Sequence, residues 1–138
     1  MPLVDLIDET FIVCPPASAA LSVHDPARWA AWWPDLDLVV FMDRGELGLR
    51  WSAVGDPVGS VEIWLEPVGD GVLLHHYLRL DPVGAMVTDR RAVRRGVRER
   101  ARRATEWKRH VWALKDELEG ERRPGDSRTA APTPMTGV

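Results

Sequence analysis

The sequence predicts an α+β fold in which a curved antiparallel sheet of about five strands covers a long C-terminal helix. Residues 59–82 contain two segments of alternating apolar and polar residues joined by Val68-Gly69-Asp70-Gly71, a pattern typical of a β-hairpin. Residues 89–119 follow as one helical segment with apolar residues at steps of three and four. Because no segment has βαβ order, we do not expect a parallel sheet.

Prolines and glycine-containing turns separate the other expected elements. These are a first or edge strand over 6–14, short helices over 17–23 and 27–33, and strands over 36–42, 47–54, 60–66 and 72–80. Pro26 suits the first turn of the second short helix, and Pro34 ends that helix. Thr88 or Asp89 can cap the long helix, and Gly120 can end it. Consecutive strands usually pair, so the last four strands should form a meander.

The composition indicates one globular domain followed by a tail. The chain has 138 residues, 45% of them hydrophobic and 28% charged, which is enough to bury a core. We expect residues 1–120 to form the domain and residues 121–138, which have little to bury, to be disordered. No run approaches about 18 consecutive apolar residues, so no membrane span is expected. A single cysteine, Cys14, and an acidic N-terminus unlike a signal peptide favour a cytoplasmic location.

The hairpin residues divide between two faces of the sheet. The expected cross-strand pairs are Val61 with Leu78, Ile63 with His76, and Leu65 with Leu74. This apolar face should cover the helix, because burial stabilises it by about 25 cal/mol per Å². Leu47, Leu49, Trp51 and Ala53 should join it from the preceding strand, and Val93, Val97, Ala101, Ala104, Trp107, Val111, Leu114 and Leu118 from the helix. Trp64 then lies on the polar face, where it packs against Arg79, marks a partner surface or shows that the faces are inverted.

The order of elements, together with short motifs, resembles the START-like helix-grip superfamily, and in particular its polyketide cyclase/dehydrase and lipid-transport branch. The motifs are Ala31-Trp32-Trp33-Pro34-Asp35 after the short helices, and Glu66-Pro67 and Gly69-Asp70-Gly71 in the hairpin. The resemblance covers about residues 6–119 and implies a sheet wrapped around the last helix, with a hydrophobic cavity between them. The family usually has about six strands between the short helices and the last helix, whereas this chain has four. The sheet should therefore wrap the helix less completely.

The predicted function is to bind a small hydrophobic molecule of aromatic, polyketide or acyl type in that cavity. The candidate ligand-binding residues are Trp33, Trp51, Ile63, Leu65, Leu74, His76, Leu78, Ala104, Trp107 and Val111. The resemblance places Trp33 at the mouth of the cavity, although each tryptophan can also be a packing residue. His76 is the lone titratable group on the apolar face, where burial would lower its pKa. It is either a hydrogen-bonded core residue or a polar anchor for the ligand.

An enzymatic alternative remains open. The resemblance allows an aromatase/cyclase-like enzyme that acts on a polyketide chain, with His76 as a proton shuttle and candidate catalytic residue. Adjacent residues of a strand point to opposite faces, so His75-His76 is not a metal-binding pair. We expect neither a metal nor a cofactor. The sequence does not decide which ligand binds, whether the protein catalyses a reaction, or what its oligomeric state is.

Arginines crowd the start of the long helix. Residues 89–110 hold ten basic and three acidic residues, a local charge of +7 against −10 for the rest of the chain. A candidate patch for an anionic partner consists of Arg91, Arg94, Arg95, Arg98 and Arg102. As an interaction module this patch could meet an anionic surface or an acidic ligand group, or it could pair with the domain's own acids. The aromatic residues that single-stranded nucleic acids require are absent among these arginines, which argues against nucleic acid.

Overall fold

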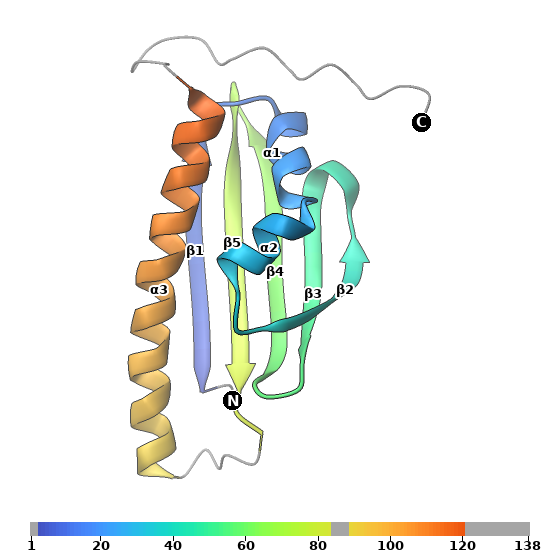
Figure 1. Ribbon diagram of the computed structural model, residues 1–138. Helices are drawn as coiled ribbons and strands as arrows, with labels where there is room; N and C mark the ends of the chain where they lie inside the picture. Colours follow the sequence, from blue (N-terminus) through green and yellow to red (C-terminus); the bar gives the residue numbers. More distant parts are fainter. Residues whose placement is uncertain (1–2, 84–88, 121–138) are drawn as a thin grey trace.

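The computed structural model describes residues 3–83 and 89–120, and it confirms the predicted α+β, helix-grip architecture (Figure 1). The elements are β1 (Val4–Ile12), α1 (Pro16–Val23), α2 (Pro26–Trp32), β2 (Asp37–Asp43), the 3-10 turn η1 (Gly45–Leu47), β3 (Gly48–Val54), β4 (Val58–Val68), β5 (Gly71–Asp81) and α3 (Arg90–Glu119). The five strands form one antiparallel sheet in the order β1-β5-β4-β3-β2. The predicted tail over 121–138 and the alternative cap Thr88 lie outside the described residues.

The β4–β5 hairpin has the predicted register. Val61 pairs with Leu78, Ile63 with His76, and Leu65 with Leu74, and all six side chains are buried. Leu49, Trp51 and Ala53 of β3 share this inner face, as predicted. Leu47 does not, because the chain turns through η1 before β3 begins and leaves this side chain 47% exposed.

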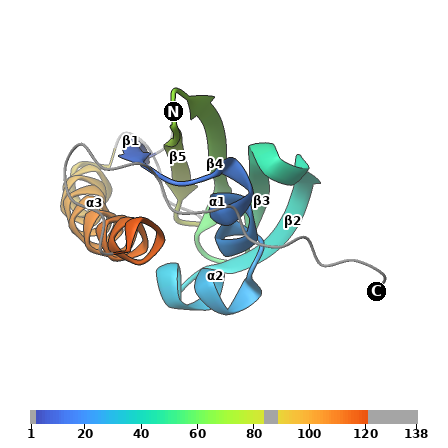
Figure 2. The same cartoon turned by 90° about the horizontal axis from the view of Figure 1, so that it is seen from above.

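The helices α1, α2 and α3 lie on the inner face of the curved sheet, with α3 alongside the edge strand β1 (Figures 1 and 2). Asp89 caps α3, because its carboxylate accepts hydrogen bonds from the backbone N–H groups of Arg91 and Ala92. Gly120 ends the helix with a φ of 61°. The helix therefore starts and stops where its capping residues predict.

The predicted apolar stripe of α3 is correct in the second half of the helix and wrong in the first. Trp107, Val111 and Leu114 are buried, and Ala104 and Leu118 are half-buried. Val93, Val97 and Ala101 are exposed, and Ala92, Gly96 and Arg103 face the protein instead. A Cβ atom on Gly96 would lie 2.6 Å from the carbonyl oxygen of Leu3. The helix backbone approaches the start of β1 here, and only glycine allows so close an approach. This contact determines which side of the first half of α3 is buried.

The outer face carries the polar residues of the hairpin, as predicted. Trp64 stacks on His75 with 4.3 Å between ring centroids, so it packs against this neighbour on the outer face. His75 is itself buried, and its Nε2 lies 3.0 Å from Oε1 of Glu66. The position of Trp64 is thus explained without inverting the faces of the sheet.

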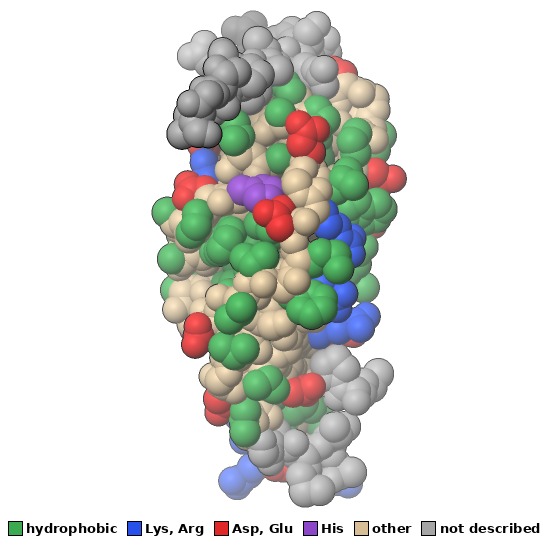
Figure 3. Space-filling model, turned by 90° about the vertical axis from the view of Figure 1, so that its right-hand side faces the viewer, with side chains coloured by type: hydrophobic (Ala, Val, Ile, Leu, Met, Phe, Trp, Pro, Cys, Tyr) green, Lys and Arg blue, Asp and Glu red, His purple; other side chains and the backbone are tan. Residues whose placement is uncertain are grey.

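The strand β2 forms the second edge of the sheet. Its exposed apolar side chains are Val39, Val40, Phe41 and Met42. Figure 3 looks onto this side of the molecule and shows apolar side chains gathered on it. Aspartates at both ends of the strand, Asp37 and Asp43, place charge beside the open edge, which disfavours pairing with another chain.

Among the described helices, none combines the length and apolar character needed to span a membrane.

Candidate functional site

His76 lies in the middle of the sheet–helix interface, inside a cluster of tryptophan rings. Its ring centroid is 4.1 Å from that of Trp107 and 5.7 Å from that of Trp33. Trp33 in turn is 5.7 Å from Trp107 in a stacked arrangement, and 5.2 Å from Trp51 in an edge-on arrangement. All four side chains are buried. These four rings therefore pack against one another between the sheet and α3.

The two ring nitrogens of His76 have different environments. Nδ1 lies 3.3 Å from the carbonyl oxygen of Glu62, and because a carbonyl can only accept, Nδ1 carries the proton. Nε2 is buried and has no hydrogen-bond partner among the residues that the structure describes. Burial lowers the pKa of His76 to about 4, against the smaller opposing effect of the Glu62 hydrogen bond. At neutral pH the imidazole is therefore uncharged, with a free acceptor at Nε2.

A small void lies beside His76. Its volume is about 10 Å³, and Trp33, Leu78, Trp107 and Arg103 are among the residues that line it. A void of this size holds about one water molecule and no larger ligand. The other six predicted ligand-binding residues do not line it: Trp51, Ile63, Leu65, Leu74 and Val111 are buried in the packed core, and Ala104 is half-buried. The ligand role of all ten residues stays a prediction.

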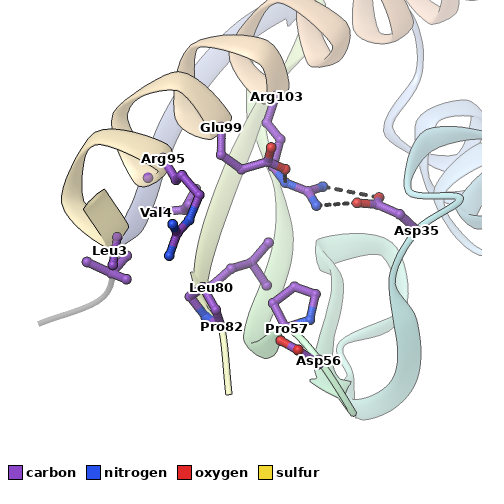
Figure 4. Close-up of a pocket in the computed structure, with 12 residues that line it drawn as sticks. Leu3, Val4, Asp35, Asp56, Pro57, Leu80, Pro82, Arg95, Glu99 and Arg103 are labelled. Atoms are coloured by element: carbon purple, nitrogen blue, oxygen red, sulfur yellow. Dashed lines mark hydrogen bonds and ion pairs between the residues drawn. The ribbon is translucent and has the colours of Figure 1, made fainter. Parts of the chain in front are cut away.

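A larger, open pocket of about 260 Å³ lies between the sheet and the first half of α3 (Figure 4). Its apolar lining consists of Leu3, Val4, Pro57, Leu80, Pro82, Ala92 and Gly96. Its polar lining consists of Asp35, Asp56, Arg95, Glu99 and Arg103. None of the ten predicted residues belongs to it. In the sequence, Gly96 is the residue that could have indicated this pocket, because a glycine within a long helix often marks a close approach of two backbones.

Arg103 lines both the open pocket and the void beside His76. Its side chain is only 6% exposed, and its Nη2 lies 2.5 Å from Oδ2 of Asp35 (Figure 4). Its Nε lies 2.8 Å from Oε1 of Glu99, one turn earlier in the same helix. A buried guanidinium held by two carboxylates therefore stands where the two cavities meet. Arg103 does not stand out in the sequence, because eight arginines crowd this part of the helix.

The predicted anionic-partner patch divides into two parts. Arg91, Arg94, Arg95 and Arg98 line a groove of about 300 Å³ on the surface of α3. Arg102 lies elsewhere and already has acidic neighbours: its guanidinium is 2.5 Å from Glu99, 3.0 Å from Glu106 and 3.7 Å from Asp35. A role toward an anionic partner stays a prediction for all five. Within residues 3–83 and 89–120, no group of three His, Cys, Asp or Glu side chains is placed to hold a metal ion.

No protein-family profile and no curated protein matches this sequence. Solved structures are similar in fold. The Polyketide_cyc-like protein Cgl2372 from Corynebacterium glutamicum is 16% identical with a TM-score of 0.60, over 88% of this chain and 96% of that one. The Aha1 dimer from Colwellia psychrerythraea is 14% identical with a TM-score of 0.55, over 85% and 97%. CalU16 from Micromonospora echinospora is 19% identical with a TM-score of 0.54, over 87% and 77%.

At these identities the likeness establishes the fold and leaves the activity open. In this chain the fold consists of the curved antiparallel sheet, the short helices after the first strand and the long C-terminal helix. The chain therefore has the helix-grip fold that its element order predicts, and it shares this fold with these three solved structures.

Proposed function

We propose that this protein binds a small, predominantly apolar molecule of aromatic, polyketide or acyl type between its sheet and α3. The open pocket of about 260 Å³ is the observation that supports this proposal most directly. Its lining is mostly apolar, and five charged residues lie among the apolar ones. Concave apolar sites with few polar groups are typical of small-molecule binding.

In this proposal the ligand binds by leaving water. Its apolar surface packs against Leu80, Pro57 and Ala92, with a gain of about 25 cal/mol per Å² buried. Four of the ten residues predicted from the sequence, Trp33, His76, Leu78 and Trp107, line the void beside His76, and Arg103 lines both that void and the open pocket. There Nε2 of His76 would accept a hydrogen bond from a ligand hydroxyl group.

Blocking the open pocket tests the proposal. N-phenyl-1-naphthylamine, a neutral apolar fluorophore, should bind the wild-type protein with a rise in emission. Ala92→Phe fills the pocket from α3, and we expect it to weaken this binding at least tenfold. Ala101→Phe makes the same change at an exposed position of the same helix and should have no effect. Absence of binding by the wild type, or equal binding by both variants, would contradict the proposal.

A second candidate is an aromatase/cyclase-like enzyme, and the partnerless Nε2 of His76 favours it. A proton shuttle works best when its pKa lies near the working pH, whereas burial holds this one at about 4. The histidine is therefore better suited to accept a hydrogen bond than to move a proton, unless bound ligand changes its surroundings. His76→Ala separates the two roles. Lost turnover of a poly-β-keto thioester with retained binding would indicate catalysis, and loss of both would indicate an anchor.

We also propose a cytoplasmic location. The single cysteine, Cys14, is buried and cannot form an internal disulfide, which suits a reducing compartment.

Native mass spectrometry of protein purified from its own host would supply the mass of any co-purifying ligand. A protein that carries no small molecule under those conditions would weaken the binding proposal.

A further inference from the structure

The first half of α3 carries charge that the domain does not neutralise. Arg91, Arg94, Arg95 and Arg98 are exposed, and across the described part of the chain no carboxylate forms an ion pair with any of them. The second half differs, because Lys115 there pairs with its neighbour Glu119. The four arginines are thus available to an anion from outside.

These arginines do not help the helix to form. Arg91 and Arg95, like Arg94 and Arg98, are like charges four residues apart on one face, which destabilises a helix. Arg91 also lies in the first turn of the helix, where the macrodipole disfavours cations. A bound anion would offset both effects.

The arginine groove and the open pocket meet at Arg95. This residue lines the groove of about 300 Å³ and also the pocket of about 260 Å³. Figure 4 shows its side chain directed from α3 toward Leu80 on β5. A ligand in the pocket therefore reaches the groove without crossing other elements.

The other charged groups of the pocket already have partners. Asp35 and Glu99 are both paired with Arg103. Oδ1 of Asp56 accepts a hydrogen bond of 3.0 Å from the backbone N–H of Val83. Arg95 is the one cation of this lining for which the described residues supply no carboxylate.

We infer that the ligand is an amphipathic anion, with its apolar body in the open pocket and a carboxylate or phosphate against Arg95 in the arginine groove. This inference rests on the proposed binding function and narrows it to a chemical class. Guanidinium groups bind both anions through paired N–H donors, so the two head groups share one recognition chemistry.

Three probes with the same chain and different head groups test this inference. Decanoate, decyl phosphate and decan-1-ol are titrated by calorimetry into the wild type, Arg95→Gln and Arg109→Gln. We expect both anions to bind the wild type at least tenfold more tightly than the alcohol. Arg95→Gln should reduce this preference below threefold, through weaker binding of the two anions. Arg109→Gln, at an exposed arginine in the second half of α3, should behave as the wild type.

The outcomes separate this inference from the proposed function. Equal binding of all three probes would contradict the inference that the ligand has an anionic head group. The proposal that the pocket binds an apolar molecule would still stand. No binding of any probe, nor of N-phenyl-1-naphthylamine, would overturn the proposed function itself. Inorganic phosphate that binds as tightly as decyl phosphate would overturn the amphipathic class, because the groove would then act without the pocket.

Phosphatidylglycerol vesicles distinguish two sources of such an anion. Protein that sediments with the vesicles and is released by decyl phosphate takes its ligand from a bilayer. Protein that stays in solution and still prefers decanoate takes a free ligand. Both results support an amphipathic anion as the ligand. Sedimentation that decyl phosphate does not reverse, or binding to duplex DNA with no preference among the probes, would overturn it.

Discussion

Arg103 and Asp35 lie 68 residues apart in the sequence, and their side chains meet at an Nη2–Oδ2 distance of 2.5 Å. Arg103 is buried on α3, whereas the side chain of Asp35, between α2 and β2, is 48% exposed. The pair therefore joins the short helical segment to the terminal helix, at the junction between the open pocket and the void beside His76.

The first prediction concerns this ion pair. Asp35→Asn should lower the free energy of unfolding by about 1 kcal/mol, because the guanidinium loses one carboxylate and keeps Glu99. Urea denaturation measures the change. Asp37→Asn removes an exposed charge nearby and should stay within about 0.5 kcal/mol of the wild type. If both variants unfold at the same urea concentration, the pair contributes no stability.

The second prediction concerns His76 and pH. Its folded pKa of about 4 lies below the ordinary value of 6.5, so the unfolded chain binds more protons between these values. Stability should therefore fall as the pH drops from 6.5 toward 4. His76→Phe removes this contribution, on the order of 3 kcal/mol. Denaturation from pH 7 to pH 4 should show a shallower decline for the variant than for the wild type.

His24 provides a control of opposite sign. Burial lowers its pKa, but the hydrogen bonds to Asp43 and to the backbone of Ala20 outweigh burial and raise the pKa above 6.5. The stability that it contributes is present at acidic pH and is lost as the pH rises through that raised value. His24→Gln should thus destabilise the protein more at low pH than at high pH. Parallel profiles for the two histidine variants would contradict the assigned environments.

The third prediction concerns Gly96. In an ordinary helix interior, alanine is more favourable than glycine by about 1 kcal/mol. Here its Cβ would lie 2.6 Å from the carbonyl oxygen of Leu3, whose N–H is itself bonded to Asp81 at 2.7 Å. We expect Gly96→Ala to lower the free energy of unfolding by about 1–2 kcal/mol and to weaken binding of the apolar probe. Val97→Ala, at the exposed next position, should change neither. A more stable Gly96→Ala variant would show that the helix does not approach β1 at this point.

The fourth prediction concerns Asp8, which links β1 to α3. Its carboxylate accepts a hydrogen bond of 3.2 Å from Nε1 of Trp107 and lies 2.6 Å from Nζ of Lys108. Asp8→Asn should lower the free energy of unfolding by about 1–3 kcal/mol, because the carboxylate is only 13% exposed. Asp5→Asn, at an exposed position of the same strand, should stay within about 0.5 kcal/mol of the wild type. Thermal unfolding followed by tryptophan fluorescence compares the two variants.

The hairpin faces were predictable because side chains of a strand alternate with a period of two. Once Ile63 is paired with His76, every other residue of β4 and β5 is assigned to a face. The second half of α3 was predictable for a similar reason, since Trp107, Val111 and Leu114 repeat at helical spacing with no competing apolar side.

The first half of α3 was not predictable in this way. Val93 and Val97 form one possible apolar side, and Ala92 and Gly96 form another. The closeness of Leu3, more than 90 residues earlier in the sequence, decides between them. Arg103 was hidden for the same reason, since its partner Asp35 is remote and many other arginines surround it.

The sequence alone determined the order of the elements, the two faces of the sheet and the concentration of arginine at the start of α3. These follow from local spacing and from the gain in burying apolar side chains. Only the tertiary structure decided that tryptophan rings fill the centre of the interface and that the open pocket lies at one end of it. That pocket joins Leu3, Leu80 and Gly96, which lie on three separate elements or their ends. No local pattern specifies how closely three distant backbones approach, because that distance depends on the packing of the whole core.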